Sequence, residues 1–255
     1  RQFYRWKDRY LPNLPTWIST LAEMEARISQ ATYMFNQPSF IRPVVSQRAE
    51  ILLDAHQLGH PFLAEEKRVD NDVLIRKKEF LIITGANMAG KSTFLRTLGA
   101  NYILAVNGMN VCSATFEFSL FHLFSSMRNT DDLSSGTSYF KAELERMRQL
   151  IRFCRSHTHT LIILDELLKG TNSKDKLHGS IVFLKKMTEL PVTGIIATHD
   201  LELAKLEEEL PALFQNYCFE ISLSDEEQYS YKIQRGVSKN LNATYLLQKI
   251  LSEEL

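Results

Sequence analysis

The stretch that decides the fold is Leu81-Ile-Ile-Thr-Gly-Ala-Asn-Met-Ala-Gly-Lys-Ser-Thr93. Its first part belongs to an apolar run, Phe80–Ile83, that is typical of a buried strand, and residues 93–98 after it have a helical pattern. Gly-x-x-x-x-Gly-Lys-Ser between a strand and a helix is the pattern of a phosphate-binding P-loop. We therefore expect an α/β protein that binds a nucleoside triphosphate.

Each part of this loop has a predicted role in phosphate binding. Gly85 and Gly90 can take the positive φ values that turn backbone N–H groups toward an anion. The helix that begins near Lys91 directs its positive end to the same place. Lys91 is expected to contact the β- and γ-phosphates, and the Ser92 hydroxyl to ligate Mg²⁺. The predicted nucleotide contacts are Gly85, Ala86, Asn87, Met88, Ala89, Gly90, Lys91, Ser92 and Thr93.

Acidic and imidazole side chains follow two later strands. Leu161–Leu164 is a continuous apolar run, typical of a strand buried on both faces, and Asp165-Glu166 comes directly after it. Open α/β sheets place their ligand sites at such strand ends. We expect Asp165 to hold hydrated Mg²⁺ and Glu166 to orient and deprotonate the attacking water. His199, which follows the apolar strand at 193–198, is predicted to contact the γ-phosphate.

Taken together, the motifs of this chain resemble those of one family, the ATPase domain of the MutS mismatch-repair proteins. The resemblance covers roughly residues 16–250. Ala86 and Ala89 stand where the family has a proline and a glycine, and neither change affects the two turn glycines, the lysine or the serine of the loop. The resemblance is carried by residues 84–93, Asp131–Phe140 with Glu143, Asp165–Ser173, Ala197–Asp200, Gly59–Phe62, Val69–Asn71 and Tyr231–Val237.

The resemblance implies an ABC-type P-loop NTPase fold, with a mostly parallel sheet flanked by helices. It also implies ATPase activity, with ATP and Mg²⁺ as cofactors and ADP as product. Val69 and Asn71 are expected near the adenine. Two copies would dimerise across their nucleotides, and DNA would be handled by regions that this chain does not contain. What those regions recognise, mismatches or other DNA structures, is left open.

Residues 134–138 carry the expectation of a composite site. They lie at the start of a helix predicted at 137–154, where unpaired N–H groups can bind an anion. By the resemblance, this element of one subunit faces the γ-phosphate held by the other, and Ser138 occupies the position that would reach across. The alternative is an ordinary helix cap, which serine often provides.

The resemblance implies that residues 1–45 are a helical lead-in from a preceding, lever-like region, and that residues 46–255 are the ATPase domain. The lead-in contains an amphipathic pattern over residues 16–36. Strand patterns are expected near 47–53 and 73–75 before the P-loop. Near the end of the chain we expect an antiparallel pair, at 217–222 and 229–234, and then a helix at 243–251.

Charge and composition favour an enzyme domain in the cytoplasm. Thirty basic and thirty acidic residues cancel, so no overall field attracts the chain to nucleic acid or anionic membranes. No stretch approaches the ~18 uninterrupted apolar residues of a membrane span, so no membrane contact is expected for this segment. The cysteines are three and far apart, which fits a reducing compartment better than a disulfide framework.

Two other functions stay open. One is a different ABC-like or SMC-like ATPase, against which the absence of an LSGGQ sequence argues. The other is a nucleotide-gated assembly module with negligible turnover. The intact Lys91, Ser92, Asp165, Glu166 and His199 favour hydrolysis over such a module.

Overall fold

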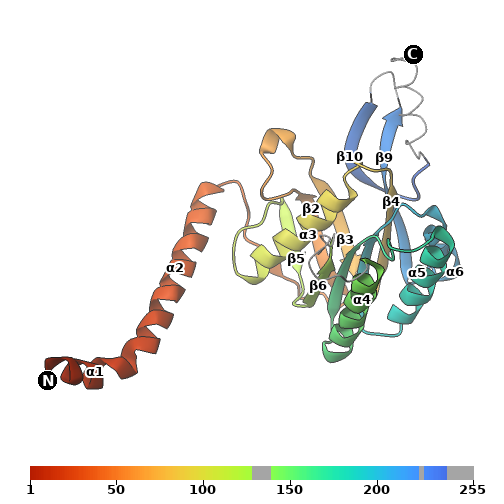
Figure 1. Cartoon of the computed structure of the whole chain (residues 1–255). Helices are drawn as coiled ribbons and strands as arrows, with labels where there is room; N and C mark the ends of the chain where they lie inside the picture. Colours follow the sequence, from red (N-terminus) through yellow and green to blue (C-terminus); the bar gives the residue numbers. More distant parts are fainter. Residues whose placement is uncertain (128–138, 224–226, 240–255) are drawn as a thin grey trace, which may run out of the picture.

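The computed structural model describes residues 1–127, 139–223 and 227–239, and it shows an α/β protein with two mixed sheets and flanking helices (Figure 1). The described elements are α1 (Gln2–Tyr10), η1 (Leu11–Asn13), α2 (Leu14–Asn36), β1 (Val44–Val45), β2 (Ile51–Leu58), η2 (Glu65–Lys67), β3 (Asn71–Arg76), β4 (Phe80–Gly85), α3 (Lys91–Val106), β5 (Thr115–Phe118), β6 (His122–Ser126), α4 (Tyr139–Ser156), β7 (Thr160–Asp165), α5 (Ser173–Met187), β8 (Val192–Ala197), η4 (Leu201–Lys205), α6 (Leu206–Glu209), β9 (Phe214–Leu223) and β10 (Glu227–Arg235).

The larger sheet has six strands in the order β10-β9-β4-β8-β7-β6. All neighbouring strands are parallel except β9 and β10, which form the antiparallel pair predicted near the end of the chain. Every residue of β4, β7 and β8 is buried, because helices or the second sheet cover both faces. This explains why these strands read as continuous apolar runs, and the predicted mostly parallel sheet is confirmed.

A smaller sheet of four strands, in the order β1-β5-β2-β3, was not predicted as a separate sheet. Its pairings are antiparallel apart from β1 with β5. The strand expected near 47–53 is β2, which begins at Ile51 and ends at Leu58. β2 pairs with β5, about sixty residues later, and such a distant pairing leaves no local pattern in the sequence.

β4 separates two hydrophobic cores. Leu81 and Ile83 point into a core shared with α3 and the smaller sheet. Phe80 and Ile82 point to the opposite face, where α4 and α5 pack (Figure 1). This alternation is the period of two that a strand requires, and it fixes the register of the strand that carries the P-loop sequence.

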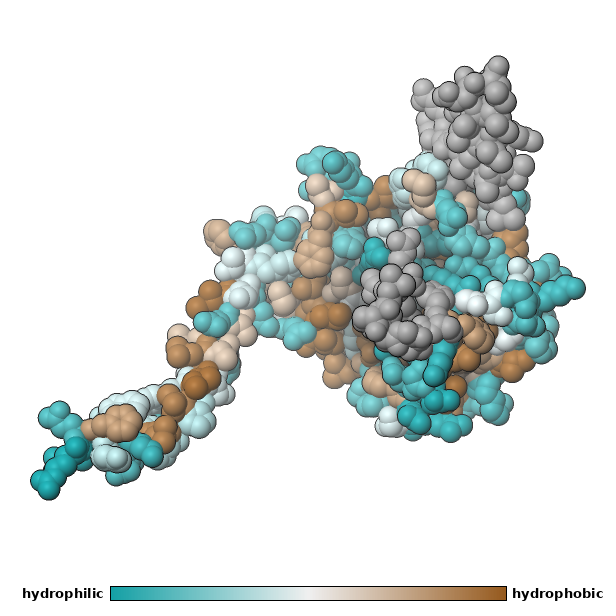
Figure 2. Space-filling model, in the orientation of Figure 1, coloured by the Kyte–Doolittle hydropathy of each residue, from teal (hydrophilic) through white to brown (hydrophobic). Residues whose placement is uncertain are grey.

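An N-terminal arm, formed by α1, η1 and α2, extends away from the two sheets (Figure 1). The helix predicted at 16–36 is confirmed as α2, and no residue of α1 or α2 is buried. Trp17, Leu21, Met24 and Ile28 follow one another at steps of three and four residues and are all exposed, which gives the arm its apolar surface in Figure 2. The division at residue 45 stays a prediction.

Two predicted elements fall outside the described residues: the segment that contains Ser138, and the helix at 243–251. Within the described part, no helix combines the length and the apolar character that a membrane crossing needs.

Candidate functional site

A cavity of 590 Å³ lies at the carboxyl ends of β4, β7 and β8, a volume suited to a small-molecule ligand. The sequence-predicted residues meet here because each follows one of these strands or belongs to a neighbouring segment. Gly85 does not line the cavity but ends β4 directly beneath the loop, and Ser138 lies outside the described residues. The predicted residues that line it are Val69, Asn71, Ala86, Asn87, Met88, Ala89, Gly90, Lys91, Ser92, Thr93, Asp165, Glu166 and His199.

The backbone of the loop depends on its two glycines. Gly85 has φ +144°, and a Cβ there would lie 2.7 Å from the carbonyl oxygen of Phe219. Gly90 has φ +110° and precedes the first residue of α3. Both positions therefore need glycine, as predicted. Ala86 and Ala89, the two departures from the family pattern, have buried methyl groups that the loop accommodates.

Lys91 is a buried cation, 5% exposed. Its Nζ donates to the carbonyl oxygens of Gly85 at 2.6 Å and Ala86 at 2.7 Å. Within the described ranges, no carboxylate lies within 4 Å of this ammonium. Burial lowers the pKa of Lys91 to about 8, although the charges of Asp165 and Glu166 oppose the shift. An anion in the cavity would supply the counter-charge that this lysine lacks.

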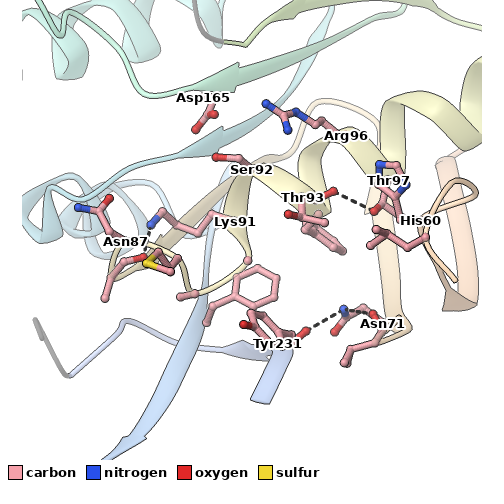
Figure 3. A pocket seen from close by; sticks show the side chains of 18 of the residues that line it. His60, Asn71, Asn87, Lys91, Ser92, Thr93, Arg96, Thr97, Asp165 and Tyr231 are labelled. Atoms are coloured by element: carbon pink, nitrogen blue, oxygen red, sulfur yellow. Dashed lines mark hydrogen bonds between the residues drawn. The ribbon is translucent and has the colours of Figure 1, made fainter. Parts of the chain in front are cut away.

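Ser92 and Asp165 lie at one end of the cavity, where Figure 3 also places Arg96. Asp165 is buried at the end of β7, and Ser92 is in the first turn of α3. Mg²⁺ usually retains several waters and is held by one or two carboxylates together with substrate phosphates. One carboxylate and one hydroxyl therefore fit that ion. The described residues contain no group of three or more histidine, cysteine or acidic side chains arranged for a metal.

Glu166 is held firmly beside Asp165. Its backbone has φ +67°, and its N–H donates to the carbonyl oxygen of Ala197 at 2.9 Å. Lys176 on α5 donates to its carboxylate, and Lys169 Nζ lies 3.8 Å from Oε2. Burial raises the pKa of Glu166, but the hydrogen bond and charge of Lys176 outweigh it, so the pKa lies below its ordinary value. The carboxyl group is thus ionised and able to accept a proton.

His199 stands next to Lys91 across the cavity floor, with 3.4 Å between His199 Nδ1 and Lys91 Nζ. Burial and then the charge of Lys91 lower the pKa of His199, so the ring is neutral at pH 7. A neutral imidazole has one ring nitrogen that donates and one that accepts, so His199 can still donate one hydrogen bond.

The other end of the cavity is lined by Val69, Asn71 and Tyr231. The Asn71 amide donates to the carbonyl oxygen of Tyr231 at 3.1 Å (Figure 3) and to that of Val69 at 3.3 Å. Its oxygen accepts from Ile233 N at 2.8 Å. Asn71 is buried, and its bonds to Tyr231 and Ile233 join β3 to β10. Its side-chain nitrogen and oxygen are both hydrogen-bonded to backbone groups. Its expected contact with adenine remains a prediction.

Sequence reasoning missed several residues of the site. Lys169, Arg96 and Tyr231 line the cavity, and Lys176 contacts Glu166 from α5. The sequence signal for Lys169 and Lys176 is a cluster of lysines just after Asp165-Glu166. Glu143, noted only as part of a motif, has a structural role, because its carboxylate accepts from the backbone N–H groups of Lys169 and Gly170 at 2.9 and 3.2 Å.

Comparison with known proteins gives a consistent result. The family model described as MutS domain V matches residues 81–247. The chain is 28% identical over 233 residues to the DNA mismatch repair protein MutS of Geobacillus sp. (strain WCH70), and the match covers 89% of the chain and 27% of that protein. It is 30% identical over 235 residues to the MutS of Ruminiclostridium cellulolyticum, with 89% and 26% covered. The chain thus spans about a quarter of the length of these relatives.

Proposed function

This chain belongs to the MutS domain V family, and from that premise we propose that it binds MgATP and hydrolyses it, as the ATPase part of a MutS-like DNA-processing protein. MutS-family membership supports ATP and Mg²⁺ as the ligands in general. Dimerisation across the nucleotide, motion of DNA-handling domains outside this chain, the ABC-type P-loop fold and a cytoplasmic location belong to the same proposal.

One observation carries the proposal: a buried lysine, with no carboxylate partner among the described residues, shares a 590 Å³ cavity with the acidic pair at the end of β7. Lys91 would bind the β- and γ-phosphates, and the loop N–H groups would surround them. Ser92 and Asp165 would hold Mg²⁺, which when bound neutralises charge on the phosphates. Glu166 would take the proton of the attacking water, and His199 would donate to the γ-phosphate.

The test is ATP turnover with Glu166 removed as a base. Glu166→Gln keeps the shape of the side chain, so ATP binding should persist while turnover falls about 10²–10⁴-fold. Steady-state phosphate release and calorimetric ATP binding measure the two effects. Glu189→Gln, at a site outside the cavity, is the matched control and should hydrolyse normally.

The result separates the candidate functions. Wild-type turnover by Glu166→Gln would show that the assigned base is wrong. ATP binding without measurable turnover by the wild-type protein would instead favour the nucleotide-gated assembly module.

The composite site proposed for the dimer has a test of its own. Ser138→Ala should preserve ATP affinity and impair ATP-driven dimerisation and hydrolysis, because Ser138 would act on the partner's nucleotide. Mixing inactive Lys91→Ala with inactive Ser138→Ala should restore part of the activity, since one site of the heterodimer is then intact. If heterodimers form and nothing is restored, Ser138 is only a helix cap.

A further inference from the structure

Lysines surround Glu166, and the steps proposed above do not use them. Lys176 Nζ donates to Glu166 Oε1, while Lys169 Nζ lies 3.8 Å from Oε2. The side chains of Lys176 and Glu166 are only 20% and 18% exposed, so solvent screens this pair less than a surface ion pair. Each carboxylate oxygen of the proposed base therefore has a cationic neighbour.

Lys176 occupies a position that does not favour a cation. It lies near the start of α5, where the helix dipole repels positive charge. The helix start is already satisfied, because the Asn172 side chain accepts from Asp175 N at 3.0 Å and Asp175 supplies the acidic residue of the first turn. Lys176 thus contributes nothing evident to the helix start, and its ion pair with Glu166 offsets the unfavourable placement.

The two lysines have different relations to the cavity. Lys169 lines it together with Glu166, whereas Lys176 is not among the lining residues. Lys176 therefore contacts Glu166 without itself lining the cavity, although its charge also acts on His199. Lys176 contacts Oε1, and Oε2 is the oxygen that lies 3.8 Å from Nζ of Lys169, a residue that lines the cavity.

We propose that Lys176 is a positioning residue for ATP hydrolysis, which holds Oε1 of Glu166 so that Oε2 faces the attacking water; this inference rests on the function proposed above. The fixed backbone of Glu166, at φ +67° and bonded to Ala197 O, completes the orientation. In the step, the water oxygen bonds to the γ-phosphorus, the bond from that phosphorus to the ADP oxygen breaks, and the water proton goes to Glu166. Lys176 keeps its own proton throughout.

The kinetic test uses the full-length protein with ATP as substrate. Lys176→Met should lower kcat about tenfold, a typical cost of losing a residue that orients a reacting group, with KM for ATP changed less than about twofold. Lys176→Arg should recover most of the loss, because it retains the charge. Lys174→Met, at an exposed lysine in the same helical turn, is the matched control and should behave as wild type.

A double variant identifies the path of the effect. In the Glu166→Gln background, Lys176→Met should cause no further loss, because the group that it orients is already absent. A crystal structure of Lys176→Met should show the Glu166 carboxylate displaced while α5 keeps its place. Thermal unfolding checks that each variant folds. If Lys176→Met does not fold, the comparison of Lys176→Arg with the wild type still tests the inference.

Three results would overturn the inference: unchanged kcat in Lys176→Met, increased kcat, which would make the pair a restraint, or an equal loss in the Glu166→Gln background. Failure of the underlying function has a different signature. If Glu166→Gln hydrolyses ATP at the wild-type rate, the proposed base is wrong; if it is inactive while Lys176→Met is normal, only the positioning role fails.

Discussion

The two ends of the cavity are built in different ways. The end with Lys91, Ser92 and Asp165 is built at the carboxyl ends of β4 and β7, two strands of the larger sheet that β8 separates. The end with Asn71 and Tyr231 joins β3 of the smaller sheet to β10 of the larger one, across 160 positions of sequence. Two short motifs, each at the end of a strand of the larger sheet, therefore encode the first end, whereas the second exists only after the two sheets have come together. We expect variants at the first end to affect ligand binding, and variants at the second to affect stability.

The largest expected effect is on ligand affinity at the Lys91 end. Lys91→Met should weaken ATP and ADP binding about 10²–10³-fold, because more than one charge-assisted hydrogen bond to phosphate is lost. Isothermal titration calorimetry measures the change, with Lys174→Met as the charge-matched control. If Lys91→Met bound ATP with nearly wild-type affinity, the Lys91 end of the cavity would not be the end that determines ligand binding.

Burial of the Lys91 ammonium should also make stability depend on pH. Its pKa is about 8 in the folded protein, against an ordinary value of 10.5, so between these pH values the unfolded chain binds a proton that the folded chain does not. As pH falls from 10.5 to 8, the nucleotide-free protein should lose up to about 3 kcal/mol of unfolding free energy, and the contribution should be constant below pH 8.

Lys91→Met lacks this contribution, so the difference in unfolding free energy between variant and wild type should change over that pH range. Urea unfolding at several pH values measures it. A difference that does not change with pH would show that the ammonium is not desolvated.

The smallest effect is expected at the other end. Asn71→Ala should lower the unfolding free energy by about 2 kcal/mol, because Ile233 N–H and Tyr231 C=O lose a buried partner. ATP affinity should fall less than about tenfold. Urea unfolding and calorimetry measure the two, with Asn107→Ala at an exposed helix end as control. If Asn71→Ala left stability unchanged and weakened ATP binding about 100-fold, Asn71 would be a ligand-binding residue. The two ends of the cavity would then not differ in the way described.

The sequence was most informative where a residue follows a strand. Lys91, Asp165, Glu166 and His199 all reach the cavity because the carboxyl ends of parallel strands meet at one edge of the sheet. The smaller sheet, the bonds of Asn71 to β10 and the Lys176–Glu166 pair were not predicted. The first two depend on which distant segments pack together, and the third, between residues ten positions apart, depends on the direction in which a loop leaves a strand. Periodicity in the sequence reports neither.

The alternation along β4 has a consequence for how this site can change by mutation. Phe80 and Ile82 support one core and Leu81 and Ile83 the other, so no side chain of these four is free to vary alone. Deleting one residue would exchange the two faces and disturb both cores together. Natural variation along β4 should therefore be restricted to exchanges among apolar side chains of similar volume, with compensating changes in the core that each side chain faces.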